Sequence, residues 1–325
     1  MSQPTLLAVP NVSEGRDAHL VDALADAFTG AGRLRLLDVH YDGDHHRSVF
    51  TLAGPQGSLA DAVLAGARVA VESIDVVREA AAGEAPGQHP HVGALDVVPV
   101  VYLDERSRGA ACAEALVVAD RIAEELGVPV FLYGELSGAG PDGSGRTRAE
   151  LRRGGVRGLL RRMAAEGGER DALSPDFGPP RLHPTAGATL VAARPPLVAF
   201  NLALAPQAGI ERARAIAADI REGGVAGLPG VRAIAIALSG GVAQVSVNVE
   251  RALEMPLAVV VEAVRARAPL AGAELVGLAP AAALEGFPAD VPLAGFDPER
   301  HVIENALRSI YGPGEANAQD DQAPR

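Results

Sequence analysis

The sequence has little of what several classes of protein need. It has no tryptophan and only 3% aromatic residues, too few for the stacking platforms that bind single-stranded nucleic acids. Its 29 Lys and Arg against 41 Asp and Glu give a formal net charge of -12, without a basic run to follow a phosphate backbone. No stretch approaches the roughly 20 apolar residues of a membrane span. We therefore expect neither nucleic acid nor a membrane as a partner.

Cysteine is nearly absent as well. The single Cys112 has no second cysteine with which to form an internal disulfide. Residues 1–10 have neither the basic region nor the apolar region of a secretion signal. We therefore expect a soluble protein of the reduced cytoplasm. With 325 residues, the chain is long enough for two medium-sized domains.

The first part of the chain alternates between strand-like apolar runs and helical patterns, which indicates an α/β fold with helices packed on a sheet. Apolar runs predict strands at residues 5–11, 33–39, 48–54, 94–103 and 128–134. Apolar residues at helical spacing predict helices at residues 19–28, 59–74 and 112–126. Residues 135–185 are rich in Gly and Pro around one predicted basic helix at 149–164. We interpret this stretch as the region between two lobes.

The second part repeats the order strand, helix, strand, strand, helix. The predicted elements are strands 196–204, 231–239 and 243–249 and helices 209–223 and 257–268. In the strand 243–249, valines alternate with Gln244, Ser246 and Asn248, so one face of it is polar and is expected to line a site. We predict domains at 1–185 and 186–311, and a disordered tail at 312–325.

Histidines are the most informative residues for chemistry. Six of them fall in three predicted loops, namely His40, His45 and His46, then His89 and His91, then His183. An imidazole has a pKa of roughly 6.5, so it exchanges protons near neutral pH without special tuning. Pro90 fixes the backbone between the second pair, and the two rings then point in different directions. None of the three loops has the spacing of a zinc signature, so we expect no metal.

Eight blocks occur in order along about 300 residues: VPNVSEGRD, LLDVxxxxDHHRSVFTLAG, GxHPxxGALDVVPV, LGVPVFLYGE, SPDFGPP, LVAFNLAL, QVSVNV and ELVGLAP. Together they resemble the formiminotransferase domain of glutamate formimidoyltransferases. The resemblance implies two ferredoxin-like α/β subdomains with a cleft or tunnel between them, in a homodimer. It also implies transfer of a formimino group from N-formimino-L-glutamate to N5 of tetrahydrofolate, which is the co-substrate.

The resemblance also assigns the catalytic histidine of the family to His89, as the general acid and base. The family's folate-contacting loop falls on Gly178–Gly187. In this loop Gly178 and Gly187 permit close approach of the backbone, and Arg181 and His183 are expected to hydrogen-bond polar parts of the folate.

Further site residues are expected around these positions. The candidates for substrate or folate binding are Arg47, His46, His91, Asp96, Asn201 and Asn248. Asp96 has an alternative role as a capping residue at the start of a strand, and Asn201 and Asn248 are candidates because they lie on polar strand faces.

The chain departs from the family in the catalytic loop. Where the family has Glu-His-Pro-Arg, this chain has Gln88 before His89 and His91 after Pro90. Arginine grips a carboxylate with two parallel hydrogen bonds and histidine does not. Two alternatives therefore stay open. One is a transferase that uses a different amino acid or a specialised metabolite, and the other is a folate-binding homologue without turnover.

Overall fold

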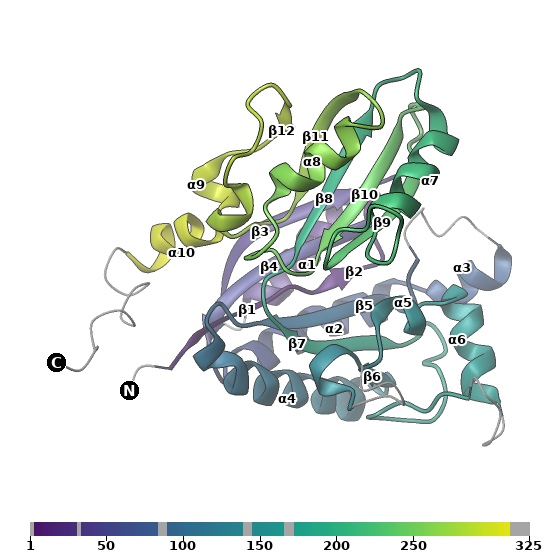
Figure 1. The fold of residues 1–325 in the computed structure, drawn as a ribbon. Helices are drawn as coiled ribbons and strands as arrows, with labels where there is room; N and C mark the ends of the chain where they lie inside the picture. Colours follow the sequence, from purple (N-terminus) through teal and green to yellow (C-terminus); the bar gives the residue numbers. More distant parts are fainter. Residues whose placement is uncertain (1–2, 31–33, 84–89, 139–144, 166–171, 313–325) are drawn as a thin grey trace. The chain divides into compact units, whose positions relative to one another are not determined.

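The structure, a computed structural model, describes residues 3–30, 34–83, 90–138, 145–165 and 172–312. The chain divides into two compact units, Met1–Pro195 and Pro196–Arg325 (Figure 1). Of the tail expected at 312–325, residues 313–325 lie outside the described part, and so do Gln88 and His89.

The first unit begins with the order strand, helix, strand, strand, helix, strand, in which β1 (Thr5–Ala8) and β2 (Asn11–Val12) together take the place of the first strand. The elements that follow are α1 (Ala18–Gly30), β3 (Arg35–Asp42), β4 (Arg47–Pro55), α2 (Leu59–Ser73) and β5 (Leu95–Val101). Strand β4 pairs antiparallel with β3 on one side and with β1 and β2 on the other, and β1 and β2 also pair with β5. This connectivity is ferredoxin-like.

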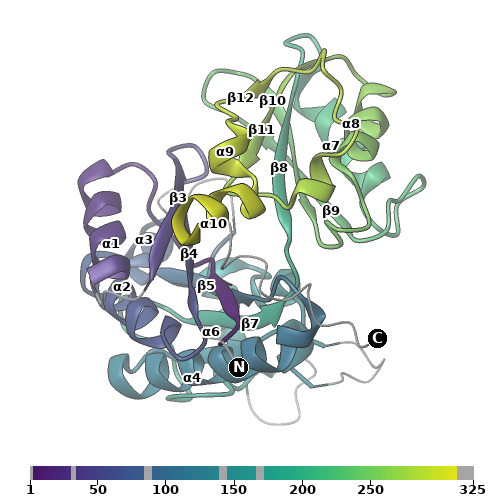
Figure 2. The ribbon, with the colours of Figure 1, turned by 90° about the vertical axis from the view of Figure 1, so that its left-hand side faces the viewer.

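Two parallel strands extend this sheet beyond β5. The added elements are α3 (Val76–Ala82), η1 (Glu105–Ser107), α4 (Arg108–Leu126), β6 (Val130–Leu132) and β7 (Thr189–Arg194). Strand β7 pairs in parallel with both β5 and β6. Helices α1, α2 and α4 cover one face of the sheet (Figure 2), and their apolar residues form one continuous core with it. The buried carboxylate of Glu114 on α4 accepts the N–H groups of Leu59 and Ala60, which satisfies the start of α2.

The Gly/Pro-rich stretch at 135–185 belongs to the first unit and does not separate two lobes. Its elements are η2 (Gly134–Leu136), α5 (Arg148–Leu151) and α6 (Gly155–Ala164). The prediction of one helix at 149–164 is wrong, because Gly154 and Gly155 have φ values of 78° and 59° and a helix cannot continue through left-handed residues. The boundary falls after Pro195 instead of residue 185, because β7 pairs within the first sheet.

The second unit repeats the ferredoxin-like order. Its elements are β8 (Val198–Leu204), α7 (Gly209–Ile220), β9 (Val231–Ala237), β10 (Ala243–Val249), α8 (Leu257–Arg265), β11 (Leu270–Val276), η3 (Ala281–Leu284), β12 (Leu293–Ala294), α9 (Pro298–His301) and α10 (Ile303–Tyr311). The strands lie in the order β12, β11, β8, β10, β9. Helices α7 and α8 cover one face of this sheet (Figure 2). The expectation of an α/β protein built from two related subdomains is therefore confirmed.

Within the described residues, none of the helices has the length and apolar character needed to cross a membrane.

Candidate functional site

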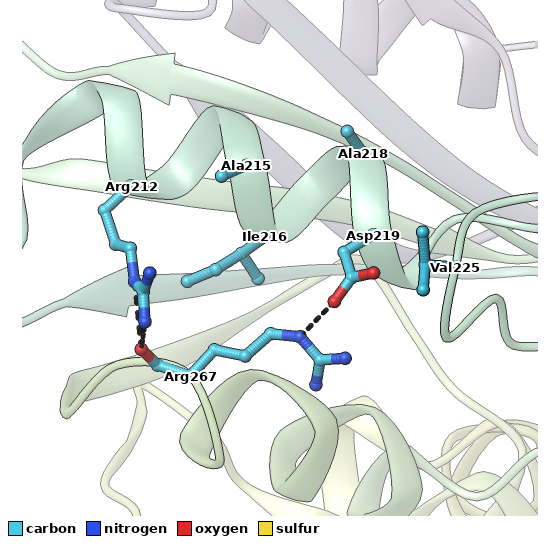
Figure 3. Close-up of a pocket in the computed structure, with 7 residues that line it drawn as sticks. All are labelled: Arg212, Ala215, Ile216, Ala218, Asp219, Val225 and Arg267. Atoms are coloured by element: carbon cyan, nitrogen blue, oxygen red, sulfur yellow. Dashed lines mark hydrogen bonds and ion pairs between the residues drawn. The ribbon is translucent and has the colours of Figure 1, made fainter.

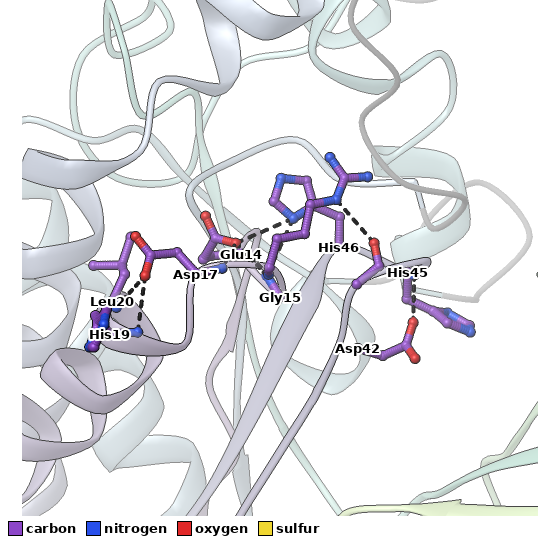
Figure 4. Close-up of polar contacts among 10 residues, drawn as sticks. Glu14, Gly15, Asp17, His19, Leu20, Asp42, His45 and His46 are labelled. Atoms are coloured by element: carbon purple, nitrogen blue, oxygen red, sulfur yellow. Dashed lines mark hydrogen bonds and ion pairs between the residues drawn. The ribbon is translucent and has the colours of Figure 1, made fainter. Parts of the chain in front are cut away.

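The loop after β2 is held by the side chain of Glu14. Its Oε1 atom accepts hydrogen bonds from the backbone N–H groups of Gly15, Arg16 and Asp17, at 2.8, 2.6 and 3.0 Å (Figure 4). A Cβ atom on Gly15 would lie 2.3 Å from the carbonyl oxygen of Asp42, so only glycine lets this loop pack against the β3–β4 hairpin.

His46 lies at the end of that hairpin and faces the same loop (Figure 4). It is buried and has a φ of 49°, a left-handed conformation that is unusual for a residue other than glycine. Its Nδ1 atom accepts the N–H of Gly15 at 3.3 Å and lies 3.5 Å from Glu14 Oε1. Burial lowers the pKa of His46, Glu14 opposes this effect, and Arg16 and His91 add to it. The ring is therefore neutral at neutral pH, as its acceptor role requires.

Asp96 forms a buried ion pair with Arg152. A bulge in the pairing of β2 with β5 lies at this residue, since Asn11 is opposite Val97 and Val12 is opposite Leu95, and such bulges redirect side chains. The Oδ2 atom of Asp96 accepts from Arg152 Nη2, and its Oδ1 atom accepts the N–H of Val92 at 2.8 Å. Both carboxylate oxygens of Asp96 therefore have partners within the protein. Through the hydrogen bond from Val92, this carboxylate anchors the segment that follows residue 89 in the sequence.

Arg47, the first residue of β4, lies close to this ion pair. Burial and the neighbouring Arg152 lower the pKa of Arg47 to about 9, with a smaller contribution from Arg148, while Asp96 and Tyr133 oppose the shift. The guanidinium stays protonated at neutral pH. The guanidinium carbon of Arg148 lies 5.9 Å from the centre of the Tyr133 ring. The site therefore gathers several cations around one carboxylate.

His183 stabilises the turn in which it lies. Its Nδ1 atom accepts the N–H of Ala186 at 3.0 Å and that of Thr185 at 3.4 Å, and burial lowers its pKa below the usual 6.5. A ring that accepts at Nδ1 carries its proton on Nε2, which leaves Nε2 as the atom available to a ligand.

This turn makes stability depend on pH. Because the folded protein holds His183 with a lowered pKa, the neutral ring stabilises the fold above pH 6.5, and this contribution is lost as the pH falls below 6.5. We expect the free energy of unfolding to fall less between pH 7 and 5 in His183→Asn, whose amide oxygen can accept from the same turn. Urea unfolding at each pH measures this, with the exposed His19→Asn as the control. Equal slopes in the two variants would contradict the assignment.

The glycines of the expected folate loop make close contacts within the protein. At Gly187, with a φ of 70°, a Cβ atom would lie 2.3 Å from the carbonyl oxygen of Val92, and Gly187 forms an isolated bridge with Gly93. At Gly178 a Cβ atom would lie 3.1 Å from the Cβ atom of Ala123. Arg181 is exposed. The Gly187 end of the loop is thus fixed to the segment anchored by Asp96.

Asn201 and Asn248 belong to the second unit. Asn201 is buried, its Nδ2 atom donates to Glu274 Oε2 at 3.0 Å, and it lies opposite Ser246 on β10. Asn248 is half-buried and lies opposite Arg232 on β9. The polar strand face predicted from the alternation in β10 is therefore present.

The structure places two pairs of the predicted residues of the first unit near one another and adds other residues. His46 and His91 are neighbours, and Arg47 and Asp96 are neighbours. Sequence reasoning missed Glu14, Arg148, Arg152 and Tyr133. Arg152 lies in the basic stretch that was predicted, but a basic stretch usually marks a solvated helix face, and nothing in it singles out one buried arginine.

Two further observations concern metal binding and a pocket in the second unit. Within the described ranges, no group of three or more His, Cys, Asp or Glu side chains could hold a metal ion. A pocket of about 350 Å³ in the second unit is lined by Arg212, Ala215, Ile216, Ala218, Asp219, Val225 and Arg267. Arg267 reaches Asp219 on α7, and Arg212 reaches the carbonyl oxygen of Arg267 (Figure 3). The lining of this pocket contains none of the predicted site residues.

Comparisons with known proteins agree on one family. Residues 5–194 match the profile of the formiminotransferase domain, N-terminal subdomain. The chain is 35% identical over 306 residues to a glutamate formimidoyltransferase of Streptococcus pyogenes serotype M1, covering 92% of this chain and 97% of that protein. It is 33% identical over 306 residues to a glutamate formimidoyltransferase of Thermoplasma acidophilum, covering 92% and 96%. It is also 37% identical over 287 residues to the formimidoyltransferase-cyclodeaminase of Gallus gallus, covering 85% of this chain and 50% of that protein.

Proposed function

The chain belongs to the formiminotransferase family, and we propose that it is a formimidoyltransferase that moves a formimino group between N-formimino-L-glutamate and N5 of tetrahydrofolate. The observation that carries this proposal is the 35% identity, across nearly the full length of both chains, to a protein named glutamate formimidoyltransferase. Tetrahydrofolate is then a co-substrate.

We assign the proton transfers to His89. The N5 amine of tetrahydrofolate attacks the formimino carbon and forms a tetrahedral intermediate, in which the attacking nitrogen must lose a proton. The bond from this carbon to the glutamate nitrogen then breaks, and that nitrogen must gain a proton to leave as an amine. One imidazole beside the carbon can take the first proton and deliver the second. The anchoring of Val92 by Asp96 supports this role, because it fixes the chain just after His89.

The remaining residues are assigned by their surroundings. The loop Gly178–Gly187 and the polar strand face of Asn201 and Asn248 are proposed to contact the folate. Arg47, His46 and His91 are proposed to contact the amino-acid donor. We further propose a cytoplasmic homodimer, as the family resemblance implies.

A second candidate is the same chemistry with a different donor. His91 stands where the family has arginine, and it is buried beside His46, so this part of the site has lost a fixed guanidinium fork.

An assay with a panel of donors separates the two candidates. The purified protein is mixed with tetrahydrofolate and with N-formimino derivatives of glutamate, aspartate, glutamine or glycine, and the formimino-folate product is followed by absorbance and by mass. We expect the highest kcat/KM with formiminoglutamate. Faster turnover of another derivative would favour the second candidate, and folate binding without turnover of any donor would contradict both.

A further inference from the structure

Several buried side-chain polar atoms have no hydrogen-bond partner among the described residues, and we consider two of them, on residues that influence the pKa of Arg47. They are the hydroxyl oxygen of Tyr133 and the Nε atom of Arg152. Each of these two residues is only 6% exposed. Native proteins pair nearly all such atoms, either internally or with a bound molecule. The two orphaned groups therefore indicate a ligand.

The chemistry of the surrounding groups selects the kind of ligand. Arg152 Nε carries a proton to donate and has no acceptor capacity, and the hydroxyl of Tyr133 is able to donate as well. Both residues lie close enough to Arg47 to perturb its pKa, and Arg47 and Arg152 are both cations. Donors and positive charge together suit a ligand that only accepts hydrogen bonds and carries negative charge, and a carboxylate fits guanidinium donors best.

We propose that Tyr133, Arg152 and Arg47 form the subsite that binds a carboxylate of the amino-acid donor. The inference rests on the proposed transfer reaction and names the groups that recognise its donor. Arg152 uses its Nη2 atom to hold Asp96, which in turn holds Val92. The subsite is therefore linked through Asp96 to Val92, which follows the proposed acid and base, His89, closely in the sequence.

This position favours the donor over the folate as the source of the carboxylate. In a formimino amino acid, the α-carboxylate is only a few bonds from the carbon that reacts. In tetrahydrofolate, the carboxylates belong to the glutamate at the far end of the molecule, beyond the aminobenzoyl group from N5. A subsite next to the reacting carbon is thus within reach of the donor's carboxylate.

Tyr133→Phe tests the proposal, because it removes one hydroxyl and changes little else. We expect the KM for formiminoglutamate to rise about tenfold, as befits the loss of one hydrogen bond to a charged group, with the KM for tetrahydrofolate unchanged. The stability of the ligand-free protein should not fall, because the hydroxyl has no partner to lose. Tyr102→Phe is the matched control, since its hydroxyl donates to Glu135 at 3.0 Å. That variant should lose stability and keep both KM values.

The other outcomes are equally informative. An unchanged KM for the donor in Tyr133→Phe, with wild-type turnover intact, would overturn the subsite and leave the proposed function standing. A higher KM for tetrahydrofolate that disappears with tetrahydropteroate, which lacks the glutamate, would move the carboxylate to the folate and overturn the assignment to the donor. If the wild type turned over no formiminoglutamate, the proposed function would fail. The subsite would then be judged by whether glutamate raises the melting temperature of the wild type but not of Tyr133→Phe.

Discussion

Replacing His89 by alanine is expected to lower kcat about 100- to 10,000-fold, the usual contribution of a positioned general acid and base. The loss is expected in kcat because the same imidazole would serve both proton transfers. It would take a proton from the attacking N5 nitrogen and give one to the departing glutamate nitrogen. The KM for tetrahydrofolate should change little, since the folate contacts are assigned to other residues.

A structural role for His89 would give a different result, and three measurements separate the two. Free imidazole in the assay should restore part of the activity of His89→Ala. The limb of the wild-type pH profile that reports the base should be absent from the variant. His19→Ala, an exposed residue of α1, should keep wild-type kinetics. Full activity of His89→Ala would show that another group transfers the protons.

Elements with a regular pattern could be predicted closely from the sequence. The strand at Ala243–Val249 has the predicted bounds, because its valines alternate strictly with polar residues and only one register buries them all. The repeated order of strands and helices also followed from local periodicity, whereas the ferredoxin-like design was implied by the family resemblance. The prediction of one basic helix at 149–164 was wrong, because it relied on the helical spacing of the apolar residues. The two adjacent glycines, Gly154 and Gly155, interrupt the helix, and only the structure reveals their left-handed conformation.

The candidate site was predictable only in part. Arg47, His46, His91 and Asp96 lie in sequence blocks typical of the family, so the sequence could point to them. The partners that define their roles come from distant positions in the chain. Arg152 is 56 residues from Asp96, and no local pattern says that this arginine, in a stretch with several others, is the buried one. Likewise, the sequence of the 183–187 turn does not reveal that His183 uses its Nδ1 atom within the turn.

Asp96→Asn is expected to destabilise the first unit strongly, by about 3–5 kcal/mol, as is typical when one partner of a buried ion pair is removed. The cause is Arg152, whose charge would stay buried, with 6% side-chain exposure, and without a carboxylate. Urea unfolding followed by far-ultraviolet circular dichroism measures the change. Asp61→Asn is the matched control, because Asp61 pairs with Arg121 with 69% of its side chain exposed, and its loss should cost at most about 1 kcal/mol.

A double variant separates the contribution of this ion pair to stability from its contribution to positioning. Replacing both partners with apolar residues, as in Asp96→Val with Arg152→Met, removes the unpaired charge and should recover most of the stability. Activity should not recover, because Val92 loses the acceptor of its N–H and Arg152 no longer contributes to the proposed carboxylate subsite. Restored kcat and KM in the double variant would mean that the ion pair only stabilises the fold, whereas stable but inactive protein would show that it also holds the catalytic segment in place.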